Sequence, residues 1–250
     1  MIIRQNGIER QKMATICSNL GTDIDSVEQR LSDLGEDGLL VSRGDDDEMG
    51  YKFRKVRYFD SPGLHLNRFY YAMASLVLGK IKNVLEIGTG DALSTIALSR
   101  LFPEATIHTI DLPENDAMYK RWREKNSKGT IREKQRSRRL SRKNIVHFEK
   151  NTFFLPSLDL PNSFEFILVD GDHTYPQTAG DIMYAYGRAG KNCFIFFHDY
   201  YMPPKRGHPS CIVGEAVDWM ASRIPEKLYI FPMGTPPGTP HEKMALVIKD

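Results

Sequence analysis

Residues 84–93 read Val-Leu-Glu-Ile-Gly-Thr-Gly-Asp-Ala-Leu, and residues 106–111 read Thr-Ile-His-Thr-Ile-Asp. The first stretch predicts a short buried strand that ends in a turn with Gly88 and Gly90, followed by apolar residues at helical spacing. The second stretch predicts another buried strand, which ends at Asp111. This order of strand, glycine turn, helix and acid-terminated strand is typical of a nucleoside-binding α/β fold, because glycines admit the ligand and the carboxylate accepts ribose hydroxyls.

The charges around the turn indicate which nucleoside it receives. A dinucleotide-binding turn carries a third glycine where this chain has Leu93, and its helix begins at a phosphate, which Asp91 would repel. Glu86, just before the turn, adds an acid that suits a cationic ligand. The pattern favours a cationic nucleoside without phosphate, with an NAD(P)-dependent oxidoreductase or a plain tight turn as alternatives.

Three blocks of sequence together resemble one enzyme family. The acid–apolar–Gly-x-Gly turn at 86–90 is similar to motif I of the class I S-adenosylmethionine-dependent methyltransferases, whose donor carries a sulfonium and an ammonium group. Residues 169–175, Val-Asp-Gly-Asp-His-Thr-Tyr, and residues 196–200, Phe-Phe-His-Asp-Tyr, resemble motifs of one subgroup, the methyltransferase domain 24-like proteins. The chain departs from that subgroup in a long basic insertion and in Ala189-Gly-Lys-Asn, where the subgroup has Gly-Gly.

The resemblance implies roles for individual residues. S-adenosylmethionine would place its amino-acid end beside Glu86 and the turn, its ribose on Asp111, its adenine near Asn151 and its methyl group beside Asp170. The cofactor-binding residues implied in this way are Glu86, Gly88, Thr89, Gly90, Asp111, Asn151 and Asp170.

Acids and histidines at two expected strand ends predict the chemistry. A hydroxyl acceptor must lose its proton as it takes the methyl group, and a histidine can accept that proton. His173 is the first candidate for this base and His198 the second, beside Asp170, although either could instead be a core histidine bonded to a carboxylate. Asp170 and Asp199 could also hold Mg²⁺ or another divalent metal, because a hard ion prefers carboxylate oxygens.

Alternating strand and helix patterns predict one α/β domain over residues 59–250. The expected strands are 84–87, 106–111, 144–149, 164–170 and 192–199, followed by a terminal hairpin of 228–231 and 244–249. This order predicts a Rossmann-like, seven-stranded sheet of the methyltransferase kind, doubly wound, with its last strand antiparallel. Because ligands bind outside the C-terminal strand ends of such sheets, the acids at these ends are expected at one edge.

Residues 1–58 predict a separate small module, with two helices and a β-hairpin in an order that resembles a winged-helix domain. Residues 23–48, from the start of its second helix to the tip of its hairpin, carry ten acids against two arginines, which would repel a DNA duplex. Small-molecule O-methyltransferases often carry such a module, so the similarity implies a dimerisation or lid role, with a solvated acidic cap as the alternative. A linking helix is expected between residues 59 and 80.

The segment 115–144 is strongly basic, with twelve lysines and arginines against three acids in a chain of net charge +2. It lies between the second and third expected strands, near the nucleoside end of the ligand. It could be a flap over an anionic substrate or a nucleic acid, or a solvated insertion.

Composition sets the remaining limits. No apolar run approaches the roughly 20 residues that span a membrane, and the three cysteines lack metal-type spacing, so we expect a cytoplasmic protein with reduced thiols. The sequence therefore predicts a homodimeric S-adenosylmethionine-dependent O-methyltransferase acting on a small molecule, such as a sugar or secondary metabolite. An RNA or other nucleic-acid methyltransferase and a non-catalytic protein of the same fold are the alternatives.

Overall fold

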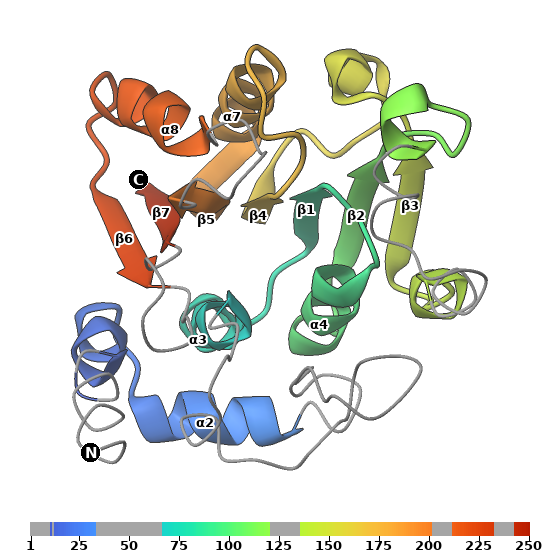
Figure 1. Cartoon of the computed structure of the whole chain (residues 1–250). Coiled ribbons are helices and arrows are strands. Elements are labelled where there is room, and N and C mark those ends of the chain that lie inside the picture. The colour runs from blue at the N-terminus through green and yellow to red at the C-terminus, as the bar shows by residue number, and fades with distance from the viewer. Residues whose placement is uncertain (1–10, 12, 34–66, 121–135, 202–211, 233–242) are drawn as a thin grey trace, which may run out of the picture. The chain divides into compact units, whose positions relative to one another are not determined.

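The described residues contain a seven-stranded sheet in the computed structural model of the chain (Figure 1). The structure describes residues 11, 13–33, 67–120, 136–201, 212–232 and 243–250. The strands are β1 (Asn83–Ile87), β2 (Thr106–Asp111), β3 (Ile145–Glu149), β4 (Phe164–Val169), β5 (Ala189–Tyr201), β6 (Leu228–Pro232) and β7 (Lys243–Lys249). Their order in the sheet is β3-β2-β1-β4-β5-β7-β6.

Strand pairing makes the sheet parallel except at one strand. β1 to β5 pair in parallel, whereas β7 runs antiparallel between β5 and β6. Short apolar strands that are buried on both faces are typical of parallel sheets, and β1 and β4 follow that pattern. The predicted doubly wound sheet with an antiparallel final strand is confirmed.

The register of the central strands brings three predicted site residues, Gly88, Asp111 and Asp170, to one level of the sheet. Ile87 of β1 is opposite both Ile110 of β2 and Val169 of β4. The residues that follow these positions are therefore neighbours, and the amide of Asp170 donates to the carbonyl of Ile87 at 2.8 Å. Because the order of the sheet reverses between β1 and β4, this level is the topological switch point where such folds bind ligands.

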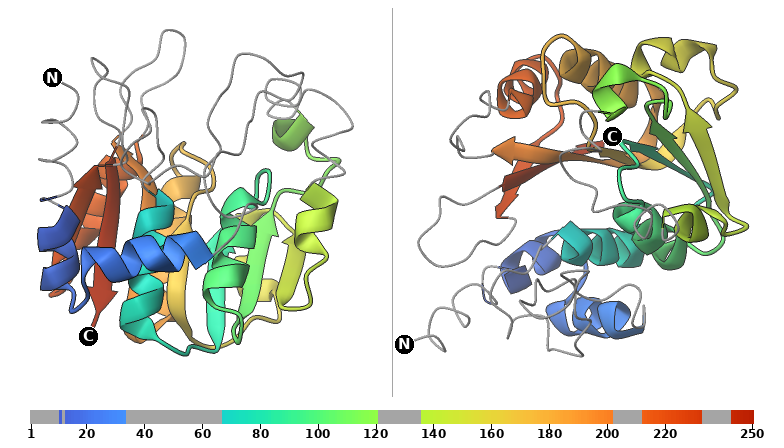
Figure 2. Two further views of the ribbon diagram at one scale, coloured as in Figure 1. Left: turned by 90° about the horizontal axis from the view of Figure 1, so that it is seen from below. Right: turned by 45° about the vertical axis from the view of Figure 1, so that its right-hand side comes forward.

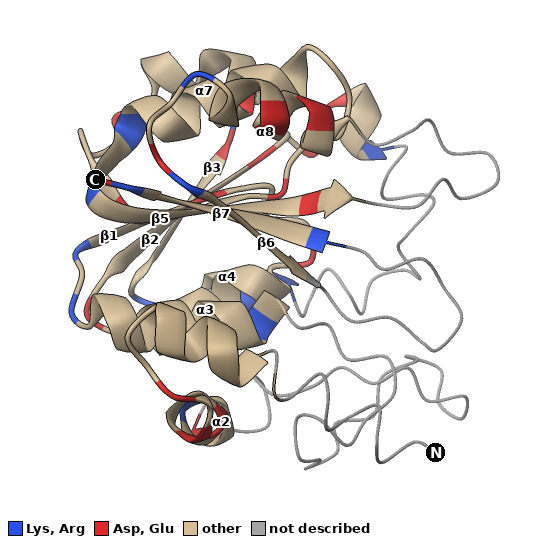
Figure 3. Ribbon diagram, turned by 90° about the vertical axis from the view of Figure 1, so that its left-hand side faces the viewer, with Lys and Arg blue, Asp and Glu red and all other residues tan. Residues whose placement is uncertain are grey.

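Helices cover both faces of the sheet. α7 (Gln177–Arg188) and α8 (Val213–Ala221) lie on one face, and α4 (Leu93–Leu101) lies on the other (Figures 2 and 3). A short 3-10 helix, η1 (Thr152–Ser157), packs against α7. The core beneath α7 and α8 consists of inward-facing strand residues such as Leu85, Ile167 and Ile195, each fully buried. Apolar burial of this kind is the main term that stabilises the domain.

The N-terminal residues form a unit of their own, which extends to Lys80. It contains α2 (Ile24–Asp33), helical residues 13–19 and α3 (Asn67–Leu78). The carboxylate of Asp23 caps α2 by accepting from the amide of Ser26 at 2.8 Å. α3 buries its aromatic residues Phe69, Tyr70 and Tyr71.

Several expectations lie outside the described residues. These are the predicted hairpin of the winged-helix-like module, the domain boundary at residue 58 and half of the basic segment, residues 121–135, so they stay predictions. None of the helices that the structure describes has the length and apolar composition of a membrane span.

Two local details differ from the sequence predictions. β5 begins at Ala189, not at Asn192, because the Gly-Lys-Asn stretch continues the strand through an irregular pairing, with Asn192 in the left-handed region at φ 61°. η1 was not predicted, since its Thr-Phe-Phe-Leu-Pro-Ser sequence has no helical periodicity. Neither difference moves a predicted site residue away from the sheet edge.

Candidate active site

The glycine turn after β1 lies directly against the end of β4. Gly88 adopts φ 99°, and a Cβ atom at this position would lie 1.9 Å from the carbonyl oxygen of Asp170. Only glycine fits a left-handed residue at that distance. The requirement for glycine at position 88 therefore links the turn to Asp170, which lies 82 positions later in the chain. The amide of Gly88 also donates to the carbonyl of Ile110 of β2 at 2.9 Å.

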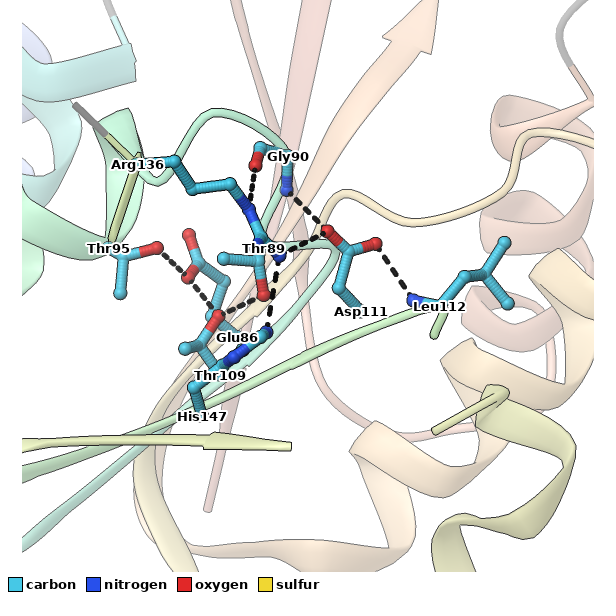
Figure 4. A network of polar contacts seen from close by, with 9 residues as sticks. All are labelled: Glu86, Thr89, Gly90, Thr95, Thr109, Asp111, Leu112, Arg136 and His147. Carbon is cyan, nitrogen blue, oxygen red and sulfur yellow. Dashed lines mark hydrogen bonds and ion pairs between the residues drawn. The ribbon is translucent and has the colours of Figure 1, made fainter. Parts of the chain in front are cut away.

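Glu86 lies beneath the turn in a buried network (Figure 4). Its Oε2 accepts hydrogen bonds from Thr95 of α4 at 2.5 Å and from Thr109 of β2 at 2.6 Å. The hydroxyl of Thr109 also lies 2.7 Å from that of Thr89. One carboxyl group thus ties the turn to a helix and to the neighbouring strand.

The protonation of Glu86 differs from what its sequence position suggested. Burial raises the pKa of Glu86 to about 8, against the hydrogen bonds from the two threonines, which lower it. Nearby Asp170 and Asp111 raise the pKa further. At neutral pH the side chain is therefore mostly the neutral acid, so it supplies hydrogen bonds rather than the negative charge that the sequence interpretation assigned to it.

Asp111, the expected ribose acceptor, is held on both of its oxygens. Oδ1 accepts from the amide of Leu112 at 2.9 Å, and Oδ2 accepts from the amide of Gly90 at 3.1 Å. Arg136 also reaches Oδ2, at 3.3 Å through Nη2, and donates through Nε to the carbonyl of Gly90 at 2.9 Å (Figure 4). The carboxylate therefore faces the turn in a fixed orientation.

Asn151 lies where β3 ends, as predicted. Its side-chain oxygen accepts from the amide of Phe153 at 3.0 Å and so caps η1. Behind it, Gln177 of α7 donates both to Thr152 and to the buried carboxyl group of Asp181, the latter at 2.8 Å. Burial raises the pKa of Asp181 to about 6, although the hydrogen bonds from Thr152 and Gln177 lower it.

The ends of β4 and β5 bring two acids and two histidines together. His198 Nδ1 lies 3.2 Å from Asp170 Oδ1 and 3.1 Å from Asp199 Oδ1. His173 Nε2 lies 3.4 Å from Asp199 Oδ2 and 3.9 Å from Asp170 Oδ1. The expected clustering of these four side chains is therefore present in the structure.

The charges of this cluster balance one another. Burial opposes the charged forms of both histidines, but Asp170 and Asp199 outweigh it for His198, whose pKa lies well above its ordinary value. The pKa of His173 is also raised, by the same two acids. Conversely, the histidines lower the pKa of Asp170 against the effect of its burial. Asp170 and the two histidines therefore favour one another's charged forms.

The same side chains fit a divalent metal ion. Single ligand atoms of Asp170, His173 and Asp199 all lie within 4.8 Å of one another. Two buried nitrogens, His173 Nε2 and His198 Nδ1, approach carboxylates but have no hydrogen-bond partner of proper geometry among the described residues. Two carboxylates and an imidazole suit several divalent ions. Asp170 and Asp199 were the predicted ligands, and His173 joins them geometrically.

The backbone of the His-Asp-Tyr block is held by α8. Asp199 adopts the left-handed region at φ 54°, which is uncommon for a residue other than glycine. The next residue, Tyr200, donates its hydroxyl to Asp218 at 2.7 Å. Gly214 packs so closely that a Cβ atom there would lie 2.3 Å from the carbonyl oxygen of Tyr200. Local strain of this kind is typical of functional sites.

Sequence reasoning missed several residues that complete the donor side. Thr95 and Thr109 bind the Glu86 carboxyl group, and Arg136 and Arg139 contact the turn, the latter by donating to the carbonyl of Asp91 at 2.9 Å. The two arginines were recognised only as part of a basic segment. Their sequence positions do not distinguish them from the other lysines and arginines of that segment.

Comparison with known proteins agrees with this site. Residues 85–200, a little under half of the chain, match the family described as methyltransferase domain. A search of curated proteins finds no match to the sequence.

Solved structures show the same fold. The O-methyltransferase TomG from Streptomyces achromogenes, involved in tomaymycin synthesis and determined in complex with SAM, is 17% identical with a TM-score of 0.53, over 97% of this chain and 99% of that chain. An O-methyltransferase from Bacillus cereus, in complex with SAH, is 13% identical with a TM-score of 0.54, over 100% of both chains. At such identities the likeness concerns the fold.

The fold and the strand-end site define a class I methyltransferase architecture. Within it, the match of residues 85–200 to the methyltransferase-domain family supports the expected class, an S-adenosylmethionine-dependent methyltransferase.

Proposed function

We propose that the protein transfers the methyl group of S-adenosylmethionine to a hydroxyl oxygen of a small molecule. The observation that carries this proposal is the contact between the glycine turn and the end of β4. Gly88 approaches the Asp170 carbonyl so closely that a donor seated on the turn would present its methyl group to the cluster of Asp170, His173, His198 and Asp199.

The donor would lie along the C-terminal ends of β1 to β4. Asp111 would accept the ribose hydroxyls, the turn with Gly88, Thr89 and Gly90 would line the amino-acid part, and Asn151 would lie near the adenine. Glu86 would contribute indirectly, because its buried carboxyl group holds the turn in place rather than contacting the donor. Asp170 would lie beside the sulfonium, whose positive charge its carboxylate stabilises.

Methyl transfer needs positioning and removal of one proton. The acceptor oxygen attacks the methyl carbon in line with the breaking carbon–sulfur bond, so the enzyme must hold both reactants at near-attack distance. His173 is the proposed base, and in the free protein Asp170 and Asp199 raise its pKa against the effect of burial. The cationic donor beside Asp170 would lower that pKa and free Nε2 to accept the acceptor's proton.

A divalent metal ion would be held by Asp170, Asp199 and His173. When bound, such an ion acidifies the acceptor hydroxyl. His198, which lies between the two carboxylates, would then keep them in place through Nδ1.

The remaining sequence predictions stay part of the proposal. We infer that residues 1–58 form the winged-helix-like dimerisation module of a cytoplasmic homodimer. Light scattering of the full chain tests the dimer, since a monomer at micromolar concentration would contradict it.

Calorimetry and methyl transfer test the function. S-adenosylhomocysteine should bind the full chain with one site per subunit, and labelled S-adenosylmethionine should methylate members of a panel of phenols, sugars and hydroxylated metabolites. Turnover with and without chelator, followed by added Mg²⁺ or Mn²⁺, decides the role of a metal. Absence of S-adenosylhomocysteine binding, together with binding of NAD(P), would overturn the proposal.

A further inference from the structure

Arg136 lies outside every motif that points to a methyltransferase, yet it contacts two groups of the proposed donor site. Its Nη2 pairs with Asp111 Oδ2 at 3.3 Å, and its Nε donates to the Gly90 carbonyl at 2.9 Å. The side chains of the pair are only 12% and 13% exposed. A buried arginine that bonds both the turn and the ribose acid is a specific arrangement rather than a solvated basic surface.

The surroundings of Asp111 explain why the arginine matters. Burial raises the pKa of Asp111, and Arg136 is the strongest opposing influence. Among the described residues, Arg136 is the cation that acts on the pKa of Asp111. Burial and Arg136 lower the pKa of His147 to about 4, and its Nε2 lies 3.3 Å from Arg136 Nη2. Glu86 is mostly neutral at pH 7. Without the guanidinium, the carboxyl group would be driven toward its neutral form.

Donor and arginine can occupy Asp111 together. A carboxylate offers about four lone-pair sites, and the structure uses three of them, for the amides of Leu112 and Gly90 and for Arg136. Replacing a buried charge-assisted pair by a neutral ribose hydroxyl would be unfavourable. The hydroxyl would therefore bind the remaining lone pair while Arg136 stays in place.

We propose that Arg136 is a positioning residue of the donor site, which holds the Asp111 carboxylate and the Gly90 carbonyl in the geometry that receives the ribose. This inference rests on the proposed function, because it requires a nucleoside at Asp111. It also gives the described end of the basic segment, helical residues 136–140, a role as one wall of the donor site, supported by the bond from Arg139 to the Asp91 carbonyl.

Calorimetric titration of the full chain with S-adenosylhomocysteine tests the proposal. Arg136→Gln should weaken binding by about tenfold or more at about pH 7.5, the usual size for loss of a hydrogen-bonded charged partner. Arg136→Lys should keep Asp111 ionised but cannot make both bonds, so its loss should be smaller. Arg138→Gln, an exposed arginine on the same helical turn, is the matched control and should bind like the wild type.

Two further readouts separate positioning from general destabilisation. In Arg136→Gln the affinity should fall more steeply than in the wild type as pH is lowered from about 7.5, because loss of the guanidinium raises the pKa of Asp111 further and lets it take up a proton. That additional fall should vanish when Asp111→Asn is added, and the double variant should bind no more weakly than Asp111→Asn alone. Thermal unfolding of each variant verifies that it is folded.

The outcomes are distinguishable. If the wild type does not bind S-adenosylhomocysteine, the proposed function fails. If the wild type binds and Arg136→Gln binds equally well or more tightly, the positioning role is overturned, and tighter binding identifies Arg136 as a competitor of the ribose. Additive losses in the double variant would also overturn it.

Discussion

The two halves of the site are built from similar polar residues but in opposite states. On the donor side, at the ends of β1 and β2, Glu86, Asp111 and the glycine turn bond to one another and to Arg136. On the acceptor side, at the ends of β4 and β5, charged groups lie 3.1–3.9 Å apart, yet His198 Nδ1 and His173 Nε2 lack hydrogen-bond geometry. The donor side is a hydrogen-bonded scaffold, although Glu86 Oε1 has no partner among the described residues, whereas the acceptor side is held by charge more than by hydrogen bonds.

The largest expected effect comes from the acceptor side. His173→Gln removes the proposed base, and methyl transfer should fall on the order of 10²- to 10⁴-fold. Because His173 lies outside the donor scaffold, S-adenosylhomocysteine affinity measured by calorimetry should change little. A large loss of donor affinity with unchanged turnover would reverse the assignment of the two halves.

The contact between Gly88 and the Asp170 carbonyl, which joins the two halves of the site, leaves no room for a larger side chain. Gly88→Ala introduces a Cβ atom 1.9 Å from a backbone oxygen at a positive φ, so we expect a loss of several kcal/mol in unfolding free energy or loss of donor binding. Gly187→Ala in α7 is the control, since nothing lies within 4 Å of its added Cβ. Equal denaturation midpoints for the two variants would show that the turn does not press on β4.

The raised pKa of Glu86 should make the free energy of unfolding depend on pH. The pKa of Glu86 is about 8 in the folded protein, against an ordinary value of 4.5, so between these values the folded state binds more protons than the unfolded state. Stability should therefore fall as pH rises through this window, by at most about 1.4 kcal/mol per pH unit.

Glu86→Gln keeps an uncharged acceptor for the threonines and should lose this slope. Its melting temperature should gain on the wild type as pH rises from about 5 to about 8. The exposed Glu215→Gln should track the wild type. A parallel pH profile for Glu86→Gln would mean that the carboxyl group is ionised in the fold.

The smallest effect tests how α8 supports the acceptor side. Tyr200→Phe removes the hydroxyl that donates to Asp218, a bond worth about 1 kcal/mol. Turnover should fall a few-fold as Asp199 loses its support. Tyr186→Phe, which loses a comparable bond to Glu226 away from the site, should be destabilised similarly without losing turnover. If both variants lose activity equally, Tyr200 has no special link to Asp199.

The same comparison explains what could be predicted from the sequence. The end of a strand can be recognised in the sequence, because an apolar run stops at a glycine or an acid. The strand before Gly88, the acid Asp111 and the Asp-Gly-Asp-His block were therefore placed correctly on the sheet. The partners of these residues have no local signal. Nothing in the sequence distinguishes Thr95 and Thr109 from other threonines, and only the folded structure selects Arg136 from twelve neighbouring cations.

The protonation of the site also lay beyond the sequence. The acid Glu86 suggested a negative charge beside the ligand, whereas burial makes it mostly neutral. The histidines suggested ready bases, whereas the adjacent acids raise the pKa of each. Both reversals arise from distances between strands that are far apart in the chain.

A crystal structure of the full chain with S-adenosylhomocysteine tests the central claim most directly. We expect a ribose hydroxyl within hydrogen-bond distance of Asp111, the sulfur beside Asp170, and Glu86, Gly90 and Arg136 unmoved, with any rearrangement confined to His173, His198 and Asp199. A nucleoside bound elsewhere, or a glycine turn that refolds to admit it, would contradict the account.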